Sequence, residues 1–383
     1  MNLLNEILPL WLWLFCSMFA LIGCVYAIFS AVLIRRLADQ VSHEKKQAAA
    51  VTILKPLYGA ESQLSANLLS FAAQDYPGDV QIICGVRDAD DPAVATVQSL
   101  TQQTPHAFEL AMGAPDAGSN RKISNIINMM KLCRHDIVVL SDSDMRVDRS
   151  YLAQVMAPFD DPSVGLVTCL YRGLPVAGFW SRIHAAAIDH HFLPNILAGL
   201  ALGLAEPCFG STIALRRETL RKIGGFEAFA DKLADDYEIG RAVRLTGDKA
   251  VIPPVVIAHT CGENSFSDVF LHELRWAKTI RLVDPLGHAG SVVTHALPMA
   301  LIAAVFDNFG TISLGILSLA LACRTLVPIE MQRGFKAEGS SIVLGPFRDL
   351  LSFTVFVASF LPISIQWRGH SYRLRRDGTM VAN

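Results

Sequence analysis

Apolar residues along this chain fall into runs of two different kinds. The run from Ile7 to Ile34 is almost unbroken, and it is long enough to cross a bilayer as a helix, which needs about 20 residues. Between residues 51 and 215 the apolar runs are short and alternate with stretches of helical spacing. From about His288 onward long apolar runs return. This pattern predicts a soluble α/β portion flanked by membrane-associated segments.

Short strands are predicted where β-branched and other apolar residues cluster between turn residues. We expect them over 51–57, 80–86, 108–110, 137–140, 164–170 and 210–215, with helices over 61–73, 93–103, 178–204 and 235–243. Strands that alternate with helices indicate βαβ units and a mainly parallel sheet. Neither the Gly-x-Gly-x-x-Gly fingerprint nor the P-loop pattern occurs, which excludes two common nucleotide-binding motifs.

The basic residues predict how the chain is oriented in the membrane. No Lys or Arg precedes the first apolar run, whereas Arg35, Arg36, Lys45 and Lys46 follow it. The positive-inside rule therefore places the amino terminus outside and the following domain in the cytoplasm. The later runs, 291–306, 309–323 and 350–365, each look short for a perpendicular span, and the basic tail (Arg368, Arg373, Arg375 and Arg376) is expected to stay cytoplasmic. Three full crossings would put that tail outside, so either one of these runs is re-entrant or interfacial or the positive-inside rule fails here, and the sequence does not decide between the two.

Composition agrees with a membrane protein that has a soluble domain. The sequence is 52% hydrophobic and only 18% charged. A net charge of −2 gives no reason to expect nucleic acid as a partner. The eight cysteines are scattered without a Cys-x-x-Cys pair, so neither a zinc ribbon nor a disulfide framework is expected.

Asp142 and Asp144 directly follow the strand predicted over 137–140. In open α/β sheets ligands bind at the carboxyl ends of strands. Two alternate carboxylates there suit Mg²⁺ or Mn²⁺ bridging to a diphosphate. Asp and Ser also favour ordinary turns and helix caps, so the local pattern alone leaves both interpretations open.

Two further acidic sites accompany this pair. Asp88 and Asp91 follow the strand over 80–86, where a carboxylate can accept hydrogen bonds from a nucleobase or ribose, although the local pattern alone favours ordinary solvated loop residues. Asp235 and Asp236 open a helix; either could simply cap it, but one of them could serve as a general base toward an acceptor hydroxyl.

A fourth group of candidates lies in His272-Glu273-Leu274-Arg275-Trp276. Arg275 can bind a diphosphate through two nitrogens, and Trp276 offers a flat apolar face to a sugar or lipid. The same stretch is also typical of a basic amphipathic helix that lies on anionic lipid headgroups.

The ordered motifs of the chain resemble those of ceramide glucosyltransferase and its bacterial relatives, and the resemblance covers nearly the whole chain. The matching motifs are Lys55-Pro56-Leu57, Gln74-Asp75-Tyr76-Pro77, Asp88-x-Asp90-Asp91-Pro92, Asn120-x-Lys122-Ile123-x-Asn125, Asp142-Ser143-x-x-Arg146-Val147, Asp235-Asp236-Tyr237, Arg275-Trp276, Tyr372-Arg373-Leu374-Arg375 and Gly378-Thr379. The stretches 118–122, 164–173 and 272–276 look most like the bacterial hopanoid branch. That branch is implied to transfer N-acetylglucosamine from UDP-GlcNAc to bacteriohopanetetrol.

The resemblance implies a GT-A nucleotide-diphospho-sugar transferase fold and inverting chemistry. It implies a UDP-sugar donor near Asp88, Asp91, Asn120 and Lys122, a divalent cation on Asp142 and Asp144, and Asp236 as the base, with Arg275 and Trp276 in the last motif. Gly210, Ser211 and Asp235 are further candidates on the acceptor side. The last motif usually begins with Gln or Arg in this family, so the role of His272 is left open.

The expected organisation is a transmembrane helix over 1–36, a cytoplasmic GT-A domain over 48–285 and a membrane region with a basic tail over 286–383, in the inner membrane. Two alternatives remain: the same chemistry with ceramide or diacylglycerol and UDP-glucose, and a polysaccharide synthase-translocon. A non-catalytic scaffold is disfavoured because every acidic site that the enzyme needs is present. The sequence leaves open which metal ion, how many carboxyl-terminal crossings and which oligomeric state the protein has.

Overall fold

The computed structural model describes residues 2–40, 49–104, 107–113, 115–362, 365–367, 370–374 and 380–382. The chain divides into two compact units, each assembled from segments that are far apart in the sequence. Unit 1 comprises residues 1–40, 173–206 and 263–363, and unit 2 comprises residues 41–172, 207–262 and 364–383.

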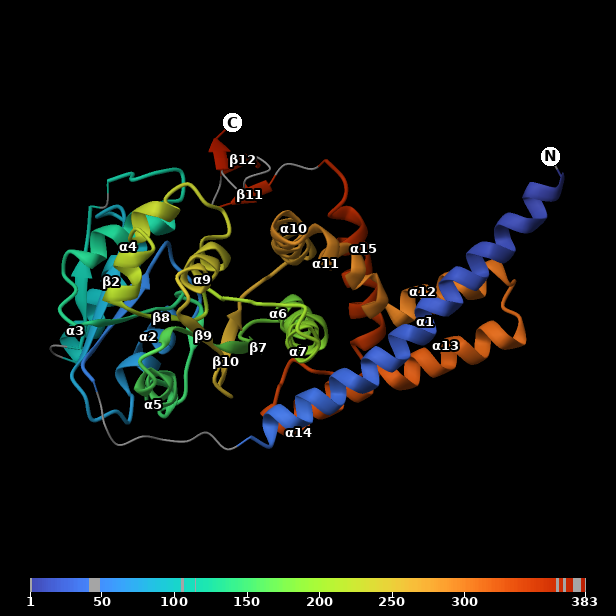
Figure 1. Cartoon of the computed structure of the whole chain (residues 1–383), viewed down its shortest axis with the longest axis horizontal. Coiled ribbons are helices and arrows are strands. Elements are labelled where there is room, and N and C mark those ends of the chain that lie inside the picture. Colours follow the sequence, from blue (N-terminus) through green and yellow to red (C-terminus); the bar gives the residue numbers. More distant parts are fainter. Residues whose placement is uncertain are drawn as a thin grey trace. The chain divides into compact units, whose positions relative to one another are not determined.

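Unit 2 is built on a sheet with the strand order β3-β2-β1-β4-β8-β6-β9 within the described residues (Figure 1). The strands are β1 (Val51–Pro56), β2 (Val80–Gly85), β3 (Glu109–Ala111), β4 (Ile137–Leu140), β6 (Val164–Thr168), β8 (Ile213–Arg216) and β9 (Lys249–Val251). Strands β1 to β4 pair in parallel, whereas β8 is antiparallel to both β4 and β6. The mainly parallel sheet is confirmed, with β8 as its reversed strand.

Helices alternate with these strands in unit 2, as predicted for 61–73, 93–103 and 235–243, whereas the helices over 121–130, 151–156 and 217–222 were not predicted. Unit 2 contains α2 (Leu64–Ala72), α3 (Pro92–Gln103), α4 (Arg121–Met130), α5 (Tyr151–Met156), α8 (Arg217–Lys222) and α9 (Asp235–Leu245). Helix α4 packs Ile126 and Met129 into the core that also holds Val138 of β4 and Leu215 of β8. Because every residue of β4 is buried, its carboxyl end is held rigidly, and the functional residues follow it directly.

A second, smaller sheet has the order β5-β10-β7. Its strands are β5 (Met145–Arg146), β10 (Val256–Cys261) and β7 (Leu170–Pro175). The single strand predicted over 164–170 is therefore wrong: it divides at Cys169 into β6 and β7. The carbonyl oxygen of Cys169 accepts a hydrogen bond from the Ser211 hydroxyl, at 3.0 Å, instead of continuing the ladder.

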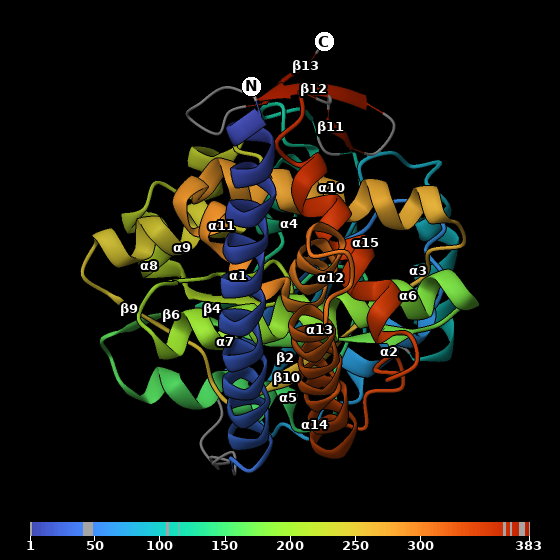
Figure 2. The same ribbon diagram turned by 90° about the vertical axis from the view of Figure 1, so that its right-hand side faces the viewer.

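Unit 1 is helical. Its helices are α1 (Asn2–Ala38), α6 (Phe179–Ala187), α7 (Leu193–Ala201), α10 (Phe266–Val283), α11 (Pro285–Gly290), α12 (Ala296–Phe306), α13 (Thr311–Arg324), α14 (Leu326–Phe335) and α15 (Gly345–Ala358). A π-helical turn (Ile188–Phe192) joins α6 to α7. The long helix α1 runs beside α12 and α13 (Figures 1 and 2).

Small residues allow α1 and α12 to approach closely. A Cβ atom built on Gly23 would lie 2.7 Å from the Cβ atom of Ala296, so only glycine fits there. Ala20, Ala27 and Ala300 are buried in the same cluster. Close backbone approach through small residues is how helices associate inside lipid, where no hydrophobic driving force separates lipid from protein.

Among the described residues, two helical segments are long and apolar enough to cross a membrane, as judged by length and composition. They are Leu8–Ala38, with a mean hydropathy of 2.3, and Thr311–Phe335, with 1.9. The run over 309–323 was predicted to be short for a perpendicular span. That prediction is wrong, because Thr325 keeps helical dihedral angles and α13 therefore continues into α14. A third segment, Pro285–Thr294 with Ala296–Phe306, passes the same test but is bent by 66°, the geometry of a broken or re-entrant span.

Three short strands end the described chain: β11 (Ile365–Trp367), β12 (His370–Leu374) and β13 (Met380–Ala382). Of the basic residues predicted to hold the tail in the cytoplasm, Arg368, Arg375 and Arg376 lie outside the described residues.

Candidate active site

Asp142 and Asp144 lie in the turn between β4 and β5, at the carboxyl edge of the large sheet. The backbone of this turn is fixed from two sides. The Asp142 amide donates to the Gly210 carbonyl, at 3.1 Å, and the Asp144 carbonyl accepts from the Thr260 amide and hydroxyl, both at 2.8 Å. These hydrogen bonds fix the backbone from which both aspartate side chains extend, without the help of a ligand.

Lys122 neutralises the first aspartate. Its Nζ atom lies 2.7 Å from Asp142 Oδ1 and 3.4 Å from Asp235 Oδ2. Burial disfavours the ammonium charge, but the surrounding carboxylates outweigh burial and hold the pKa of Lys122 well above its usual range. The lysine is thus a fixed positive charge at the sheet edge, as phosphate binding requires.

Asn120 fixes the position of Lys122 at the start of α4. Its side chain caps α4 by accepting a hydrogen bond from the Ile123 amide, at 3.1 Å, so Lys122 falls in the first helical turn. The Asn120 amide group also donates to the Lys232 carbonyl, at 2.8 Å, and to Asp235 Oδ1, at 3.2 Å. Asn120 therefore joins the first turn of α4 to the segment that opens α9.

His259 of β10 contacts the second aspartate. Its Nε2 atom lies 3.2 Å from Asp144 Oδ2. Burial lowers the pKa of the imidazole, but the Asp144 carboxylate raises it more, so the pKa of His259 lies well above its ordinary value. Sequence reasoning missed this residue, because only the pairing of β10 with β5 brings His259 opposite Met145 and so beside Asp144.

Lys55 belongs to the motif Lys55-Pro56-Leu57, but the sequence predicts no role for it in the site. Its side chain is fully buried, lies 3.8 Å from the centroid of the Phe71 ring and donates to the Asp142 carbonyl and, at 3.3 Å, to the Ser141 hydroxyl. Burial lowers the pKa of Lys55 to about 8. Through these two hydrogen bonds Lys55 stabilises the backbone of the turn that carries Asp142 and Asp144.

Gly210 leaves space beside Asp142. A Cβ atom at this position would lie 2.6 Å from Asp142 Oδ2 and 3.1 Å from Lys122 Nζ. The residue was a candidate on the acceptor side, and the structure places it against the Asp142–Lys122 pair. Its neighbour Ser211 is buried and donates its hydroxyl to the backbone.

Asp236 lies in the first turn of α9 and faces the same loop. Its Oδ2 atom accepts from the Gly210 amide, at 3.0 Å, and its Oδ1 atom from the Tyr237 amide, at 2.8 Å. Burial, with repulsion from Asp235, raises the pKa of Asp236 to about 6. A carboxylate tuned in this way suits a general base near neutral pH, since catalytic efficiency is highest when the pKa lies near the working pH.

Asp91 is placed differently from the other aspartates. It caps α3 by accepting from the Ala93 amide, at 2.8 Å, and both of its oxygens accept from the Gly59 amide, at 2.9 and 3.0 Å. Asp88 is exposed in the preceding turn. Asp91 therefore shapes the loop after β1, and its contacts within the described residues do not include the Asp142 cluster.

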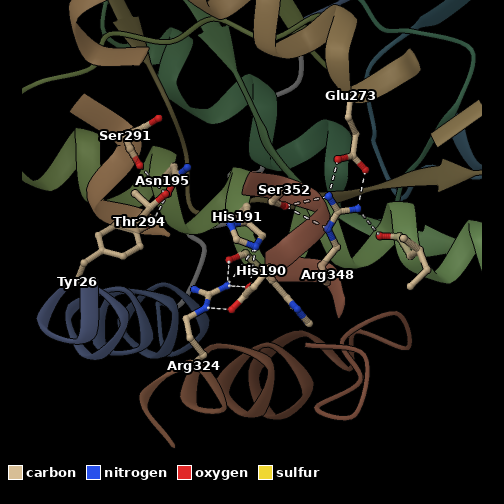
Figure 3. A network of polar contacts seen from close by, with 12 residues as sticks. Tyr26, His190, His191, Asn195, Glu273, Ser291, Thr294, Arg324, Arg348 and Ser352 are labelled. Atoms are coloured by element: carbon tan, nitrogen blue, oxygen red, sulfur yellow. Dashed lines mark hydrogen bonds and ion pairs between the residues drawn. The ribbon is translucent and has the colours of Figure 1, made fainter. Parts of the chain in front are cut away.

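His272, Arg275 and Trp276 lie on α10 of unit 1. The Nδ1 atom of His272 lies 2.9 Å from Glu263 Oε1, and the Trp276 ring centroid lies 4.7 Å from that of His272. On the buried side of α10, Glu273 forms a two-pronged ion pair with Arg348, at 2.7 and 2.6 Å (Figure 3). This ion pair anchors α10 within unit 1.

The profile of glycosyl transferase family 21 matches residues 15–380. The chain belongs to this family. Ceramide glucosyltransferase 3 of Caenorhabditis elegans is 25% identical over 95% of this chain and 83% of its own length, and ceramide glucosyltransferase 1 of the same organism is 25% identical over 94% and 81%. The protein is accordingly a glycosyltransferase.

A solved structure identifies the fold of this family 21 enzyme. The mannosyltransferase PcManGT from Pyrobaculum calidifontis, solved in complex with GDP-Man and Mn²⁺, aligns with 90% of this chain and 98% of its own, with a TM-score of 0.56 and 19% identity. The expected GT-A fold is thereby confirmed.

The residues of this family 21 site fit a divalent cation. Asp142 and Asp144 offer carboxylate oxygens, the donors that Mg²⁺ and Mn²⁺ prefer, and His259, which is protonated against Asp144, could add its imidazole nitrogen once that proton is released as the ion binds. Burial chiefly raises the pKa of Asp142, and the charge of Asp144 adds to it, so an added cation would relieve their repulsion. The side chain of Asp142 is 32% exposed, which leaves room for an ion to reach it.

Proposed function

We propose that this family 21 enzyme transfers a sugar from a UDP-sugar to a hydroxyl group of a membrane lipid, with inversion at the anomeric carbon. The observation that carries this proposal is the position of Asp236. It is a carboxylate with a near-neutral pKa, and it is bonded to the same Gly210 loop that borders the Lys122–Asp142 pair.

Asp236 would act on the acceptor. It accepts the proton of the attacking hydroxyl while the hydroxyl oxygen forms a bond to the anomeric carbon, and the bond from that carbon to the diphosphate breaks. The diphosphate leaves with the bonding electron pair. Because the hydroxyl attacks the face opposite the leaving group, an α-linked donor gives a β-glycoside.

Lys122 and Arg275 would act on the donor. Lys122 is held at the sheet edge by two carboxylates and can exchange one of these contacts for a phosphate oxygen. Arg275 is proposed to stabilise charge on the diphosphate, and Trp276 to contact the sugar or the lipid. Asp142, Asp144 and His259 would hold Mg²⁺ or Mn²⁺, which when bound acts as a Lewis acid for the leaving diphosphate. Asp88 and Asp91 are proposed to lie near the uridine, Asp91 by shaping the loop after β1.

The relatives support a sphingolipid-type acceptor. Ceramide glucosyltransferases 3 and 1 of Caenorhabditis elegans, which this chain matches over 83% and 81% of their length, favour UDP-glucose and ceramide. The motif resemblance over 164–173 and 272–276 instead favours UDP-GlcNAc and a hopanoid polyol. Both acceptors present a primary hydroxyl on an apolar body, so the same base and leaving-group residues serve either.

The apolar helices support a multi-pass enzyme of the inner membrane whose unit 2 faces the cytoplasm. Leu8–Ala38 and Thr311–Phe335 suit full spans, and the bent segment 285–306 suits a broken one. With the amino terminus outside, a third crossing by this segment returns strands β11 to β13 to the cytoplasm with the rest of unit 2. A polysaccharide synthase-translocon needs more long spans to line a pore than these described helices offer.

The test uses the full chain, purified in detergent with Mn²⁺ or Mg²⁺. Radiolabelled UDP-glucose and UDP-GlcNAc are each offered with ceramide and with bacteriohopanetetrol, and the lipid product is separated and counted. We expect label in one lipid and its loss in Asp236→Asn. Glu238→Gln, a charge change on the same helix, serves as the matched control and is expected to stay active. Full transfer by Asp236→Asn would remove the proposed base, and no lipid product from any pair would overturn the function.

A further inference from the structure

Two histidines and a glutamate of unit 1 converge at one point. His184 belongs to α6, Glu263 precedes α10 and His272 lies in the second turn of α10. Glu263 Oε1 lies 2.9 Å from His272 Nδ1 and 3.6 Å from His184 Nε2. All three donor atoms lie within 4.8 Å of one another.

These separations suit a tetrahedrally bound metal ion. With metal–ligand bonds of about 2.0–2.1 Å, neighbouring ligand atoms of a tetrahedral zinc site are about 3.3 Å apart. The two distances from Glu263 Oε1, 2.9 and 3.6 Å, fall on either side of this value. Small rotations of the side chains would therefore complete the geometry. A set of three protein ligands also leaves the fourth position for water or a substrate atom.

The surroundings of His184 match those of a metal ligand. While its Nε2 atom faces Glu263, its Nδ1 atom lies 3.5 Å from Glu273 Oε1. Glu273 is fixed in turn by two hydrogen bonds from the fully buried Arg348 (Figure 3). Histidines that bind metals commonly contact a carboxylate through the second ring nitrogen, which fixes the tautomer and the ring orientation.

The carboxylate of Glu263 is not saturated by its contacts with the two histidines. The second oxygen of Glu263, Oε2, is buried and has no hydrogen-bond partner within the described part of the chain.

We propose that His184, Glu263 and His272 form a second metal site, in unit 1, for a borderline transition-metal ion of the zinc type. Two imidazoles and one carboxylate favour such an ion over Mg²⁺, which prefers oxygen ligands. The bound ion joins α6 to α10 and fixes the His272 ring, against which Trp276 packs. The ion thus holds α10 in position. It also gives His272 a role that Gln or Arg, the usual first residues of the family motif, would not have.

The test measures metal binding rather than sugar transfer, so its outcome does not depend on the proposed function. The full chain in detergent carries Asp142→Asn and Asp144→Asn to silence the strand-edge site. It is stripped with a chelator and titrated with Co²⁺, whose visible absorption reports nitrogen and oxygen ligation. We expect about one equivalent to bind with an absorption band between about 500 and 650 nm, and Zn²⁺ to displace it.

Single substitutions then locate the site. His272→Gln, which restores a residue usual in the family motif, and the near-isosteric Glu263→Gln are each expected to weaken Co²⁺ binding at least tenfold. His135→Gln, which changes a histidine of unit 2, is the matched control and leaves binding unchanged. Thermal unfolding of each variant without metal verifies folding, and Zn²⁺ is expected to raise the melting temperature of the parent but not of His272→Gln. No Co²⁺ band in the folded parent, or an undiminished band in both site variants, would overturn the proposal.

Discussion

The Nε2 atom of His259 lies 3.2 Å from Asp144 Oδ2, which brings a residue of β10 to the end of β4 across the small sheet. If His259 binds or orients the cation, His259→Ala should raise the half-saturating Mn²⁺ concentration about 10- to 100-fold, the range seen when a supporting group of a metal site is removed. The measurement is sugar transfer against Mn²⁺ concentration.

His135 provides a control for this experiment. It forms another His–Asp contact in unit 2, with its Nε2 atom 3.1 Å from Asp79 Oδ2. His135→Ala should leave the Mn²⁺ dependence unchanged. Equal Mn²⁺ dependence in the His259 and His135 variants would exclude a metal role for His259.

Gly210→Ala should reduce activity at least tenfold while the protein stays folded. The new methyl group would meet Asp142 Oδ2 at 2.6 Å and Lys122 Nζ at 3.1 Å, so the pair must shift. A displacement of about 1 Å in a reacting site can cost about a hundredfold in rate. Gly178→Ala, where no atom lies within 4 Å of the new methyl group, is the matched control. Steady-state transfer rates and thermal unfolding of both variants decide the outcome.

The pH dependence of kcat/KM should reflect Asp236. Its pKa is raised to about 6, chiefly by burial, and a general base works in its deprotonated form. The rate should therefore rise with pH through about 6 and level off above it. The same profile measured on Glu238→Gln should coincide with that of the unchanged enzyme. A rate already constant from pH 5 upward would show that Asp236 does not limit the reaction as a base.

Removing Arg348 should destabilise unit 1 strongly. Arg348→Met leaves Glu273 buried without its partner, which typically costs about 3–5 kcal/mol. The double variant Arg348→Met/Glu273→Gln should recover part of this loss, because the unpaired charge is gone. Unfolding in detergent, followed through the full double-mutant cycle, measures the coupling. Additive effects of the two substitutions would show that the ion pair contributes nothing of its own.

Local patterns predicted much of the unit 2 fold. The strands β1, β2 and β4 and the helices α2 and α3 agree with the expected segments within a few residues, because buried runs of β-branched residues and turn signals are local properties. The residues at strand ends were also identified, and Asp142 and Lys122 form a direct ion pair.

The parts that could not be predicted depend on contacts distant in sequence. The reversal of β8 is set by its neighbours β4 and β6, which the pattern of residues 213–216 does not reveal. His259 and Lys55 reach Asp142 and Asp144 only through strand pairing and burial. The continuation of α13 into α14 depends on Thr325 remaining helical before Pro328, where composition alone suggested an end.

The assembly of unit 1 from residues 1–40, 173–206 and 263–363 has a consequence for biosynthesis. Helix α1 is made before residues 41–172 and 207–262 of unit 2, whereas α12, α13 and α14, which pack against it, are made after them. Most of unit 2 is therefore synthesised before α1 can meet these three helices. A chain truncated after residue 262 would keep every acidic strand-end residue but would leave uncovered the face of α1 that packs on α12, α13 and α14.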